Sequence, residues 1–247
     1  MVKRELKDQL ILFHEILHLS PCAKKHLNYL INTMIFNRLK LSNSCTSNII
    51  DIDSENTFES SKISIQGSNN TVKIGKFLKI KNLTINLKGD NKQIIIEPSS
   101  RIINNLKLVS IRANNQKIKI GENFDCGGVE VQMNDGNENL IIGDDCMFSW
   151  GIKIRTSDGH SVIDLDTNKA INLPRDVTIG NRAWIGEDVS ILKGVKILDD
   201  CVIGSRSVLT KVFKEGNCVI AGYPAEIVKR NIKWNRQKPD LYNARNS

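Results

Sequence analysis

Aliphatic residues recur at every sixth position in the C-terminal half of this chain. The ladder has seven members, and a small or β-branched residue follows each of the first six by four positions. A period of six fits neither an amphipathic helix nor a single alternating strand. It is typical of a parallel β-helix, in which three short faces make one coil and aliphatic side chains stack inward from coil to coil. The ladder consists of Leu173, Ile179, Ile185, Ile191, Ile197, Ile203 and Leu209, and the small residues are Val177, Ala183, Val189, Val195, Cys201 and Ser207.

A looser repeat precedes this ladder. Its anchors Ile74, Ile96, Ile120 and Ile142 are spaced by 22, 24 and 22 residues. Three hexads need only 18 residues, so each of these coils is expected to carry an extra turn of four to six residues. Clusters of Asn, Asp and Gly before each anchor suit such turns, because these residues tolerate left-handed backbone angles. The sequence therefore predicts an all-β solenoid that begins well before the regular hexads.

One coil departs strongly from this spacing. Ile142 and Ile179 are 37 residues apart, which leaves room for a 19-residue excursion that we place at residues 156–173. Long loops on rigid scaffolds tend to carry function. This one contains Asp158-Gly159-His160-Ser161, while the other histidines occur only at positions 14, 18 and 26. A functional role for His160 competes with the alternative of an exposed or hydrogen-bonded histidine without chemistry.

The chain divides into three expected regions: an N-terminal helical segment over 1–45, a β-helix with its extruded loop over 46–215, and a C-terminal segment over 216–247. In the first region, a second helix is expected to start at Ser20, with Pro21 at its first helical position. The helices could pack on the solenoid, mediate assembly or lie on a membrane surface, which is the less common use. The expected apolar faces are Leu6, Leu10, Phe13 and Leu17, and then Leu27, Leu30, Ile31, Met34 and Leu39.

The charge balance favours an anionic partner. Lys and Arg number 35 against 27 Asp and Glu, a net charge of +8 over 247 residues. Such a surface suits phosphates, acidic glycans, nucleic acid or anionic membranes, although ordinary solvated charge is an equal alternative. Nucleic acid is disfavoured, because neither a basic helix with interleaved aromatics nor zinc-finger spacing occurs. A metal site is also disfavoured, since His160 has no second His or Cys at ligand spacing.

The cysteines and the N-terminal stretch predict a cytoplasmic protein. The six cysteines are scattered without a C-x-x-C pair, which indicates reduced thiols. The apolar stretch 10–19 contains His14, Glu15 and His18, so it reads neither as a signal peptide nor as a membrane span.

Several motifs together resemble the hexapeptide-repeat acyltransferases, over roughly residues 140–235. The Asp158-Gly159-His160-Ser161 loop and the closing Asn231-Ile232-Lys233-Trp234 look most like the polysaccharide O-acetyltransferase branch. The other matching stretches are Val177–Gly186, Ile191–Val195, Val202–Lys211 and Ala221–Lys229.

This resemblance implies a left-handed β-helix that forms a homotrimer, with acetyl-CoA in the groove between adjacent solenoids. His160 matches the general base, which takes the proton of the acceptor hydroxyl. Trp184 matches an aromatic near the thioester and, with Asp158, belongs to the substrate-binding side. Asp158, Asp164 or a backbone carbonyl could orient the imidazole. The coenzyme contacts fall on Glu187, Ser205, Thr210, Lys211 and Lys229.

Three departures from the family pattern concern the coenzyme side. Arg206 replaces a glycine in Gly204-Ser205-Arg206-Ser207, Glu187 stands where a small polar residue is common, and the stretch 211–214 lacks the usual proline. They put individual coenzyme contacts in question more than the class of enzyme.

The sequence thus predicts an acetyl-CoA-dependent O-acetyltransferase. Its expected acceptor is a sugar hydroxyl of a bacterial capsule, O-antigen or exopolysaccharide, with the basic charge favouring an anionic glycan. An imidazole can remove the hydroxyl proton near neutral pH, so direct transfer without a covalent enzyme intermediate is expected. An N-acyltransferase acting on an amino-sugar precursor, or a non-catalytic solenoid scaffold, are the alternatives.

Overall fold

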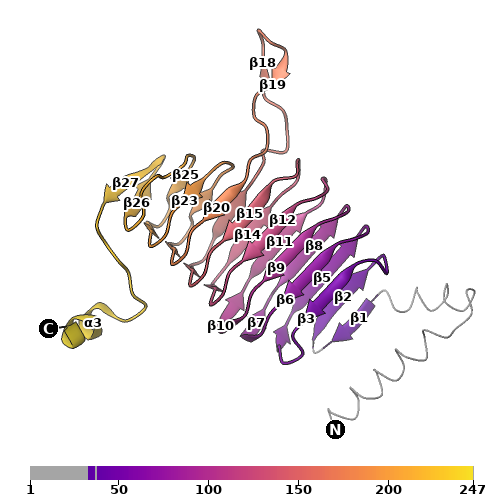
Figure 1. Cartoon of the computed structure of the whole chain (residues 1–247), viewed down its shortest axis with the longest axis horizontal. Coiled ribbons are helices and arrows are strands. Elements are labelled where there is room, and N and C mark those ends of the chain that lie inside the picture. Colours follow the sequence, from indigo (N-terminus) through magenta and orange to yellow (C-terminus); the bar gives the residue numbers. More distant parts are fainter. Residues whose placement is uncertain (1–32, 37, 247) are drawn as a thin grey trace, which may run out of the picture.

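The computed structural model describes residues 33–36 and 38–246, and most of them form a parallel β-helix (Figure 1). Successive strands turn through three faces, so that each strand pairs with the strand one coil before it and the strand one coil after it. This is the fold that the resemblance implies, a left-handed parallel β-helix.

Three sheets make the faces of the solenoid. Sheet A contains β1 (Thr33–Phe36), β2 (Leu39–Asn43), β5 (Ser61–Gln66), β8 (Thr84–Lys88), β11 (Leu106–Ser110), β14 (Val129–Gln132), β17 (Ile152–Arg155), β22 (Ser190–Ile191) and β25 (Val208–Leu209). Sheet B contains β3 (Ile49–Ile52), β6 (Thr71–Ile74), β9 (Gln93–Ile96), β12 (Lys117–Ile120), β15 (Asn139–Ile142), β20 (Val177–Ile179) and β23 (Lys196–Ile197). Sheet C contains β4 (Phe58–Glu59), β7 (Phe77–Lys81), β10 (Ser99–Asn104), β13 (Asp125–Cys126), β16 (Met147–Phe148), β21 (Trp184–Ile185), β24 (Val202–Ile203), β26 (Val219–Gly222) and β27 (Ala225–Lys229).

The core consists of aliphatic columns that run through the coils. On sheet B, the predicted anchors lie opposite one another from β6 to β15, and Ile142 then pairs with Ile179 across the 37-residue gap. The ladder residues from Ile179 to Leu209 are all buried, as are the small residues between them. These predictions are confirmed. Leu173 is the exception, because its side chain is 64% exposed and lies outside the columns.

The corners of the early coils are built by asparagine and glycine. Asn69, Asn91 and Asn115 adopt φ values of 56°, 56° and 61° in successive coils, and Gly67 and Gly89 also have positive φ. Asparagine tolerates this region because its short polar side chain bonds locally. The expected left-handed turns are therefore confirmed. Left-handed residues also occur in the 18-residue coils, at Arg182 and Arg206, so the extra length of the early coils lies instead in longer strands such as β5 and β8.

The N-terminal prediction is wrong where the structure describes it. Met34 and Leu39 were expected on a helix face, but they lie in the antiparallel pair β1 and β2. Strand β2 also pairs in parallel with β5, and Leu39 is buried. Stacking on the first coil thus overrides the helical spacing, since tertiary packing outweighs local propensity. The rest of the expected helices, up to residue 32, lies outside the described residues.

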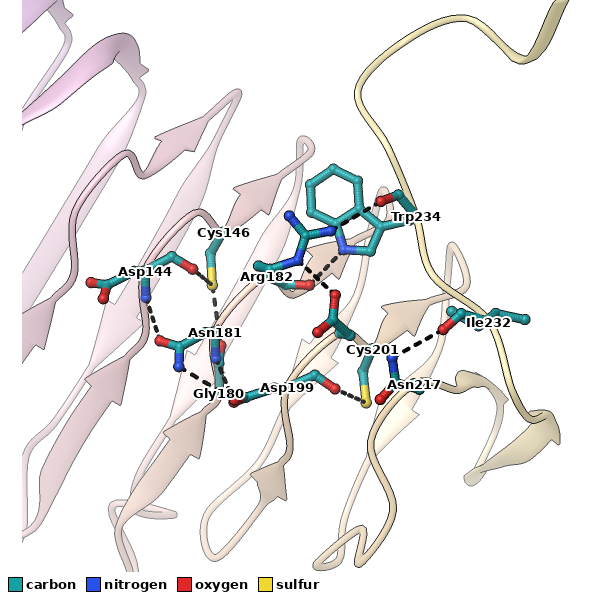
Figure 2. Close-up of polar contacts among 11 residues, drawn as sticks. Asp144, Cys146, Gly180, Asn181, Arg182, Asp199, Cys201, Asn217, Ile232 and Trp234 are labelled. Carbon is teal, nitrogen blue, oxygen red and sulfur yellow. Dashed lines mark hydrogen bonds and ion pairs between the residues drawn. The ribbon is translucent and has the colours of Figure 1, made fainter. Parts of the chain in front are cut away.

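The C-terminal segment returns along the solenoid after the antiparallel pair β26 and β27, and ends in α3 (Pro239–Asn246) (Figure 1). Figure 2 shows Trp234 of this segment against the corner that joins sheet B to sheet C. Its indole donates to the Arg182 carbonyl at 2.5 Å, and the Arg182 guanidinium donates to the Trp234 carbonyl at 3.1 Å. Arg236 pairs with Asp125 at 2.6 Å. No helix in the described part of the chain has the length and apolar character to cross a membrane.

Candidate active site

The chain leaves the solenoid after β17 and returns at β20. Between them, the hairpin of β18 (Ile163–Asp164) and β19 (Lys169–Ala170) projects well away from the coils (Figure 1). His160 lies in the first leg of this excursion and is exposed. Gly159, with φ of 81°, turns the chain just before it.

Asn172 joins the two legs of the excursion at its root. Its side-chain amide donates to the Asp158 carboxylate at 2.7 Å and to the His160 carbonyl at 2.8 Å. Its side-chain oxygen accepts from the Val162 amide at 2.8 Å. One side chain in the returning leg therefore fixes the backbone at His160 and Val162 and the carboxylate of Asp158.

Lys193 ties this root to the next coil. Its ammonium forms an ion pair with Asp158 and donates to the Asn172 carbonyl at 2.9 Å. The Lys193 side chain is only 13% exposed, so it reaches the loop from a partly enclosed position. The hydrogen bonds from Lys193 and Asn172 lower the pKa of Asp158 below its ordinary value.

The two carboxylates that could have oriented the imidazole are engaged elsewhere. Asp158 is held by Lys193 and Asn172, and Asp164 accepts from the Thr167 amide and hydroxyl at 2.7 Å each. Asp158 therefore stabilises the loop that carries His160, rather than contacting the ring.

A hollow of about 250 Å³ opens beside His160. Its walls include Asp135, Ser157, Ser161 and Pro174. The Gly159 amide donates to Asp135 at 2.8 Å, and its carbonyl accepts from Arg112 at 3.2 Å. The histidine is thus placed at the edge of a polar depression whose backbone is tied to neighbouring coils.

Trp184 lies on a different face from His160. It belongs to β21 in sheet C and is 39% exposed, with its ring 6.0 Å from that of Trp234. Trp234 is itself held by cation–π contacts with Arg182 and Arg236. The structure therefore does not bring Trp184 and the excursion together within one chain.

The residues expected to contact the coenzyme lie in the last coils. Glu187 and Ser205 are neighbours at the corner between sheets C and A, where the Glu187 amide donates to the Ser205 hydroxyl at 3.3 Å. Thr210 and Lys211 follow β25, and Lys229 ends β27 on an exposed surface. Lys211 is paired with Glu226, so it would have to exchange that partner for a phosphate.

Arg206, which replaces the family's glycine, sits beside Ser205. It has a φ of 60°, a conformation that favours glycine. Its side chain is exposed and lies 3.9 Å from Asp188. The replacement thus leaves the corner's shape intact and adds a positive charge beside the expected coenzyme residues.

Sequence reasoning missed Asn172 and Lys193, which hold the root of the excursion. Asn172 and Lys193 are ordinary loop residues by type, and only their position beside the excursion would have marked them. In residues 33–36 and 38–246, no group of three His, Cys, Asp or Glu side chains is placed to hold a metal ion.

Comparisons with known proteins bear on this arrangement. Residues 176–211 match the family described as bacterial transferase hexapeptide (six repeats). A polysialic acid O-acetyltransferase of Neisseria meningitidis is 39% identical over 191 residues, which cover 77% of this chain and 87% of that relative. Another, from Escherichia coli O1:K1 / APEC, is 35% identical over 127 residues, 51% of this chain and 40% of the relative. The crystal structure of the polySia-specific acetyltransferase NeuO has a TM-score of 0.66 and 29% identity, and the match covers 85% of this chain and 99% of that one.

Proposed function

Because the chain belongs to the hexapeptide-repeat acyltransferases, in their polysaccharide O-acetyltransferase branch, we propose that it moves the acetyl group of acetyl-CoA to a hydroxyl of an anionic capsular polysaccharide. The 39% identity to a polysialic acid O-acetyltransferase over most of both chains carries this proposal. The location of His160 on an excursion anchored to the solenoid supports it. Acetyl-CoA is a cytoplasmic metabolite, so the proposed reaction takes place in the cytoplasm.

His160 is the proposed general base. As the acceptor hydroxyl attacks the thioester carbonyl, the imidazole takes the hydroxyl proton. The bond between the carbonyl carbon and sulfur then breaks, and the imidazolium returns the proton to the departing thiolate. The acetyl group passes directly to the sugar oxygen, so no serine or cysteine of the enzyme carries it.

The active site is proposed to form between subunits of a homotrimer. Trp184 and the coenzyme-side residues Glu187 and Ser205 lie on sheet C and its corner with sheet A, away from the excursion that carries His160. A rigid solenoid cannot bend to bring these surfaces together. Neighbouring copies related by a threefold axis could supply them from two chains, as closed cyclic oligomers commonly do.

The coenzyme's phosphates require cations, and the last coils offer them. Arg206 is exposed next to Ser205, and Lys229 is exposed at the end of β27. Lys211 could bind a phosphate once its ion pair with Glu226 breaks. Glu187 is exposed at the same corner and would repel phosphate at close range. We therefore assign the phosphates to the lysines, and the backbone around Glu187 and Ser205 to the uncharged pantetheine arm.

Substitution of the base tests the chemistry. We expect purified His160→Ala to bind acetyl-CoA as the wild type does and to lose acetyl transfer by on the order of 10²–10⁴-fold. Leu165→Ala, at the exposed tip of the same excursion, is the matched control and should keep its activity. Turnover by His160→Ala close to the wild-type rate would rule out this residue as the base.

Mixing two inactive variants tests the composite site. Chains with His160→Ala and chains with Trp184→Ala are mixed in equal amounts and reassembled. If the two residues come from different subunits, about one active site in four should be intact, and the mixture should show about a quarter of the wild-type activity. No recovery in mixed trimers would place both residues in one chain's site and contradict the proposal.

The choice of acceptor separates this function from its alternatives. Hydroxyl acceptors should be acetylated and amino sugars should not, whereas an N-acyltransferase would show the reverse. A scaffold would bind no acetyl-CoA in calorimetry. Loss of acetyl groups from the surface polysaccharide of a deletion strain, measured by mass spectrometry, would establish the acceptor.

A further inference from the structure

Trp150 occupies an exposed corner of the solenoid that the proposed chemistry does not use. It lies between β16 and β17 and is 61% exposed. A side-chain carbon added to Gly127 would come within 2.8 Å of the Trp150 indole nitrogen. The five-membered ring of the indole therefore contacts the glycine of the preceding coil, and a side chain at that position would force the ring to shift.

The strand register places Trp150 in line with the coenzyme-side residues. Phe148 pairs with Ile185, and the Asp188 amide bonds to the Trp150 carbonyl at 2.9 Å. The Arg206 amide bonds in the same way to the Glu187 carbonyl at 2.7 Å. Trp150, Glu187 and Ser205 thus occupy one corner position in three successive coils, with Trp150 on the side away from the last coil.

Two adjoining hollows meet at Trp150. The larger, of about 640 Å³, lies over sheet C, and we call it the aromatic hollow. The smaller, of about 510 Å³, lies toward sheet A and includes Lys107, Glu130 and Lys153. The residues that define the aromatic hollow here are Leu78, Arg101, Ile102, Asp125, Trp150 and Trp184. Trp184, the residue assigned to the thioester end, therefore shares this hollow with Trp150.

The free charges beside the hollows are positive. Asp125 is taken by Arg236 at 2.6 Å, and Glu130 by Lys107 at 3.2 Å. Arg101 and Lys153 form no ion pair with any residue that the structure describes. An aromatic surface flanked by unpaired cations suits a ligand that has both an apolar ring face and a negative charge.

We propose that the aromatic hollow binds the acceptor, with one sugar ring of an anionic glycan stacked on Trp150 and its carboxylate paired with Arg101. This rests on the proposed function, since it names the place from which the hydroxyl reaches the thioester. Coenzyme residues occupy the same corner in the later coils, so the earlier coils and sheet C remain for the acceptor. A glycan is favoured over a second copy of this chain because Arg101 has no ion-pair partner among the described residues, and burying an unpaired charge in an interface core is costly.

Kinetics on polysialic acid and on its carboxyl-reduced, neutral form test the inference. Trp150→Ala should raise KM for both polymers by roughly tenfold or more, the usual effect of removing a tryptophan anchor. KM for acetyl-CoA should not change, and Trp150→Phe should restore part of the affinity. Arg101→Ala should raise KM for the charged polymer alone. Ile141→Ala, an exposed aliphatic residue on sheet B, is the control and should leave both values unchanged.

Three further outcomes are decisive. Unchanged KM for the polymers in Trp150→Ala, with transfer intact, would overturn the acceptor site and leave the proposed function standing. Dissociation of the Trp150→Ala oligomer in sedimentation would show instead that this face is an interface between copies. If the wild type transfers nothing, polymer binding in calorimetry that the wild type shows and Trp150→Ala lacks would support the acceptor site and reject the function.

Discussion

The root of the excursion tests whether the anchored position of His160 controls the rate of acetyl transfer. Asn172→Ala removes three hydrogen bonds: to the Asp158 carboxylate, to the His160 carbonyl and from the Val162 amide. A net hydrogen bond contributes about 0.5–1.5 kcal/mol, with exposed ones near the lower end. The loss therefore sums to roughly 1.5–3 kcal/mol. None of these bonds reaches the aliphatic columns, so the effect falls on the loop alone.

A bias of this size lowers the ratio of the anchored to the released loop conformation by about 10- to 100-fold, since 1.4 kcal/mol is a tenfold change in an equilibrium constant. We expect kcat/KM for acetyl transfer to fall with the anchored fraction, by up to the same factor, while the melting temperature stays within about 2 °C of the wild type. Hydrogen exchange of the amides around His160 should accelerate. Asn172→Asp keeps the acceptor for Val162 but sets a second carboxylate against Asp158, so it should be at least as impaired.

Thr167→Ala is the matched control, because among the described residues the Thr167 amide and hydroxyl bond within the hairpin, to Asp164. In this variant, hydrogen exchange of the amides around His160 and kcat/KM for acetyl transfer should both match the wild type. Faster exchange in Asn172→Ala with kcat/KM within twofold of the wild type would refute the reasoning, since it would show that His160 does not need this anchored position.

Three other perturbations follow from the buried and paired ionisable groups. Hydrogen bonding to Lys193 and Asn172 lowers the pKa of Asp158. Protection of the loop amides against hydrogen exchange should therefore be complete at neutral pH and be lost only as the pH falls through that lowered pKa. In Lys193→Met, the same measurement against pH should show protection lost at higher pH, nearer the ordinary pKa of about 4. Burial lowers the pKa of Lys92 to about 8, so above that pH the folded state holds fewer protons than the unfolded chain. The free energy of unfolding, measured by urea titration, should therefore rise toward pH 10 by up to about 3 kcal/mol. Lys92→Met should abolish this rise. Burial raises the pKa of Cys126, Cys146 and Cys201 to about 12, whereas a hydrogen bond with Ser47 lowers the pKa of Cys45. Iodoacetamide at pH 8 should therefore label Cys45 in the native protein, and the other three thiols only after unfolding. Mass spectrometry would detect the labelled sites.

The repeat period was enough to predict which residues share a column. Ile142 and Ile179 pair although 37 residues separate them, because a coil must return to the same face whatever loop it carries. The same rule misassigned Leu173, which keeps the spacing of the ladder but lies in the excursion. Spacing alone cannot separate an aliphatic residue in a column from a loop residue that happens to lie six positions before the first column residue.

The site was less predictable than the columns for a physical reason. The resemblance identified His160 by its motif, but the residues that hold it act through contacts between segments distant in sequence. Lys193 lies 35 residues from Asp158 and meets it only because the coil after the excursion stacks beneath its root. Trp150 gains its place beside Trp184 from strand register across the inserted loop.

The division between rigid columns and one anchored loop also constrains how the enzyme could change its acceptor. Residues at the corner shared by Trp150, Glu187 and Ser205 are fixed by backbone bonds from coil to coil, so their spacing cannot be altered without disturbing the aliphatic core beneath them. Side chains that point outward from the early coils carry no such restriction. If the proposed acceptor site is correct, a change at Trp150 or Arg101 alters glycan binding while the coils proposed to hold the coenzyme stay intact. Under this proposal, specificity for the glycan and capacity for acetyl transfer are separable, and they meet only where the aromatic hollow reaches Trp184.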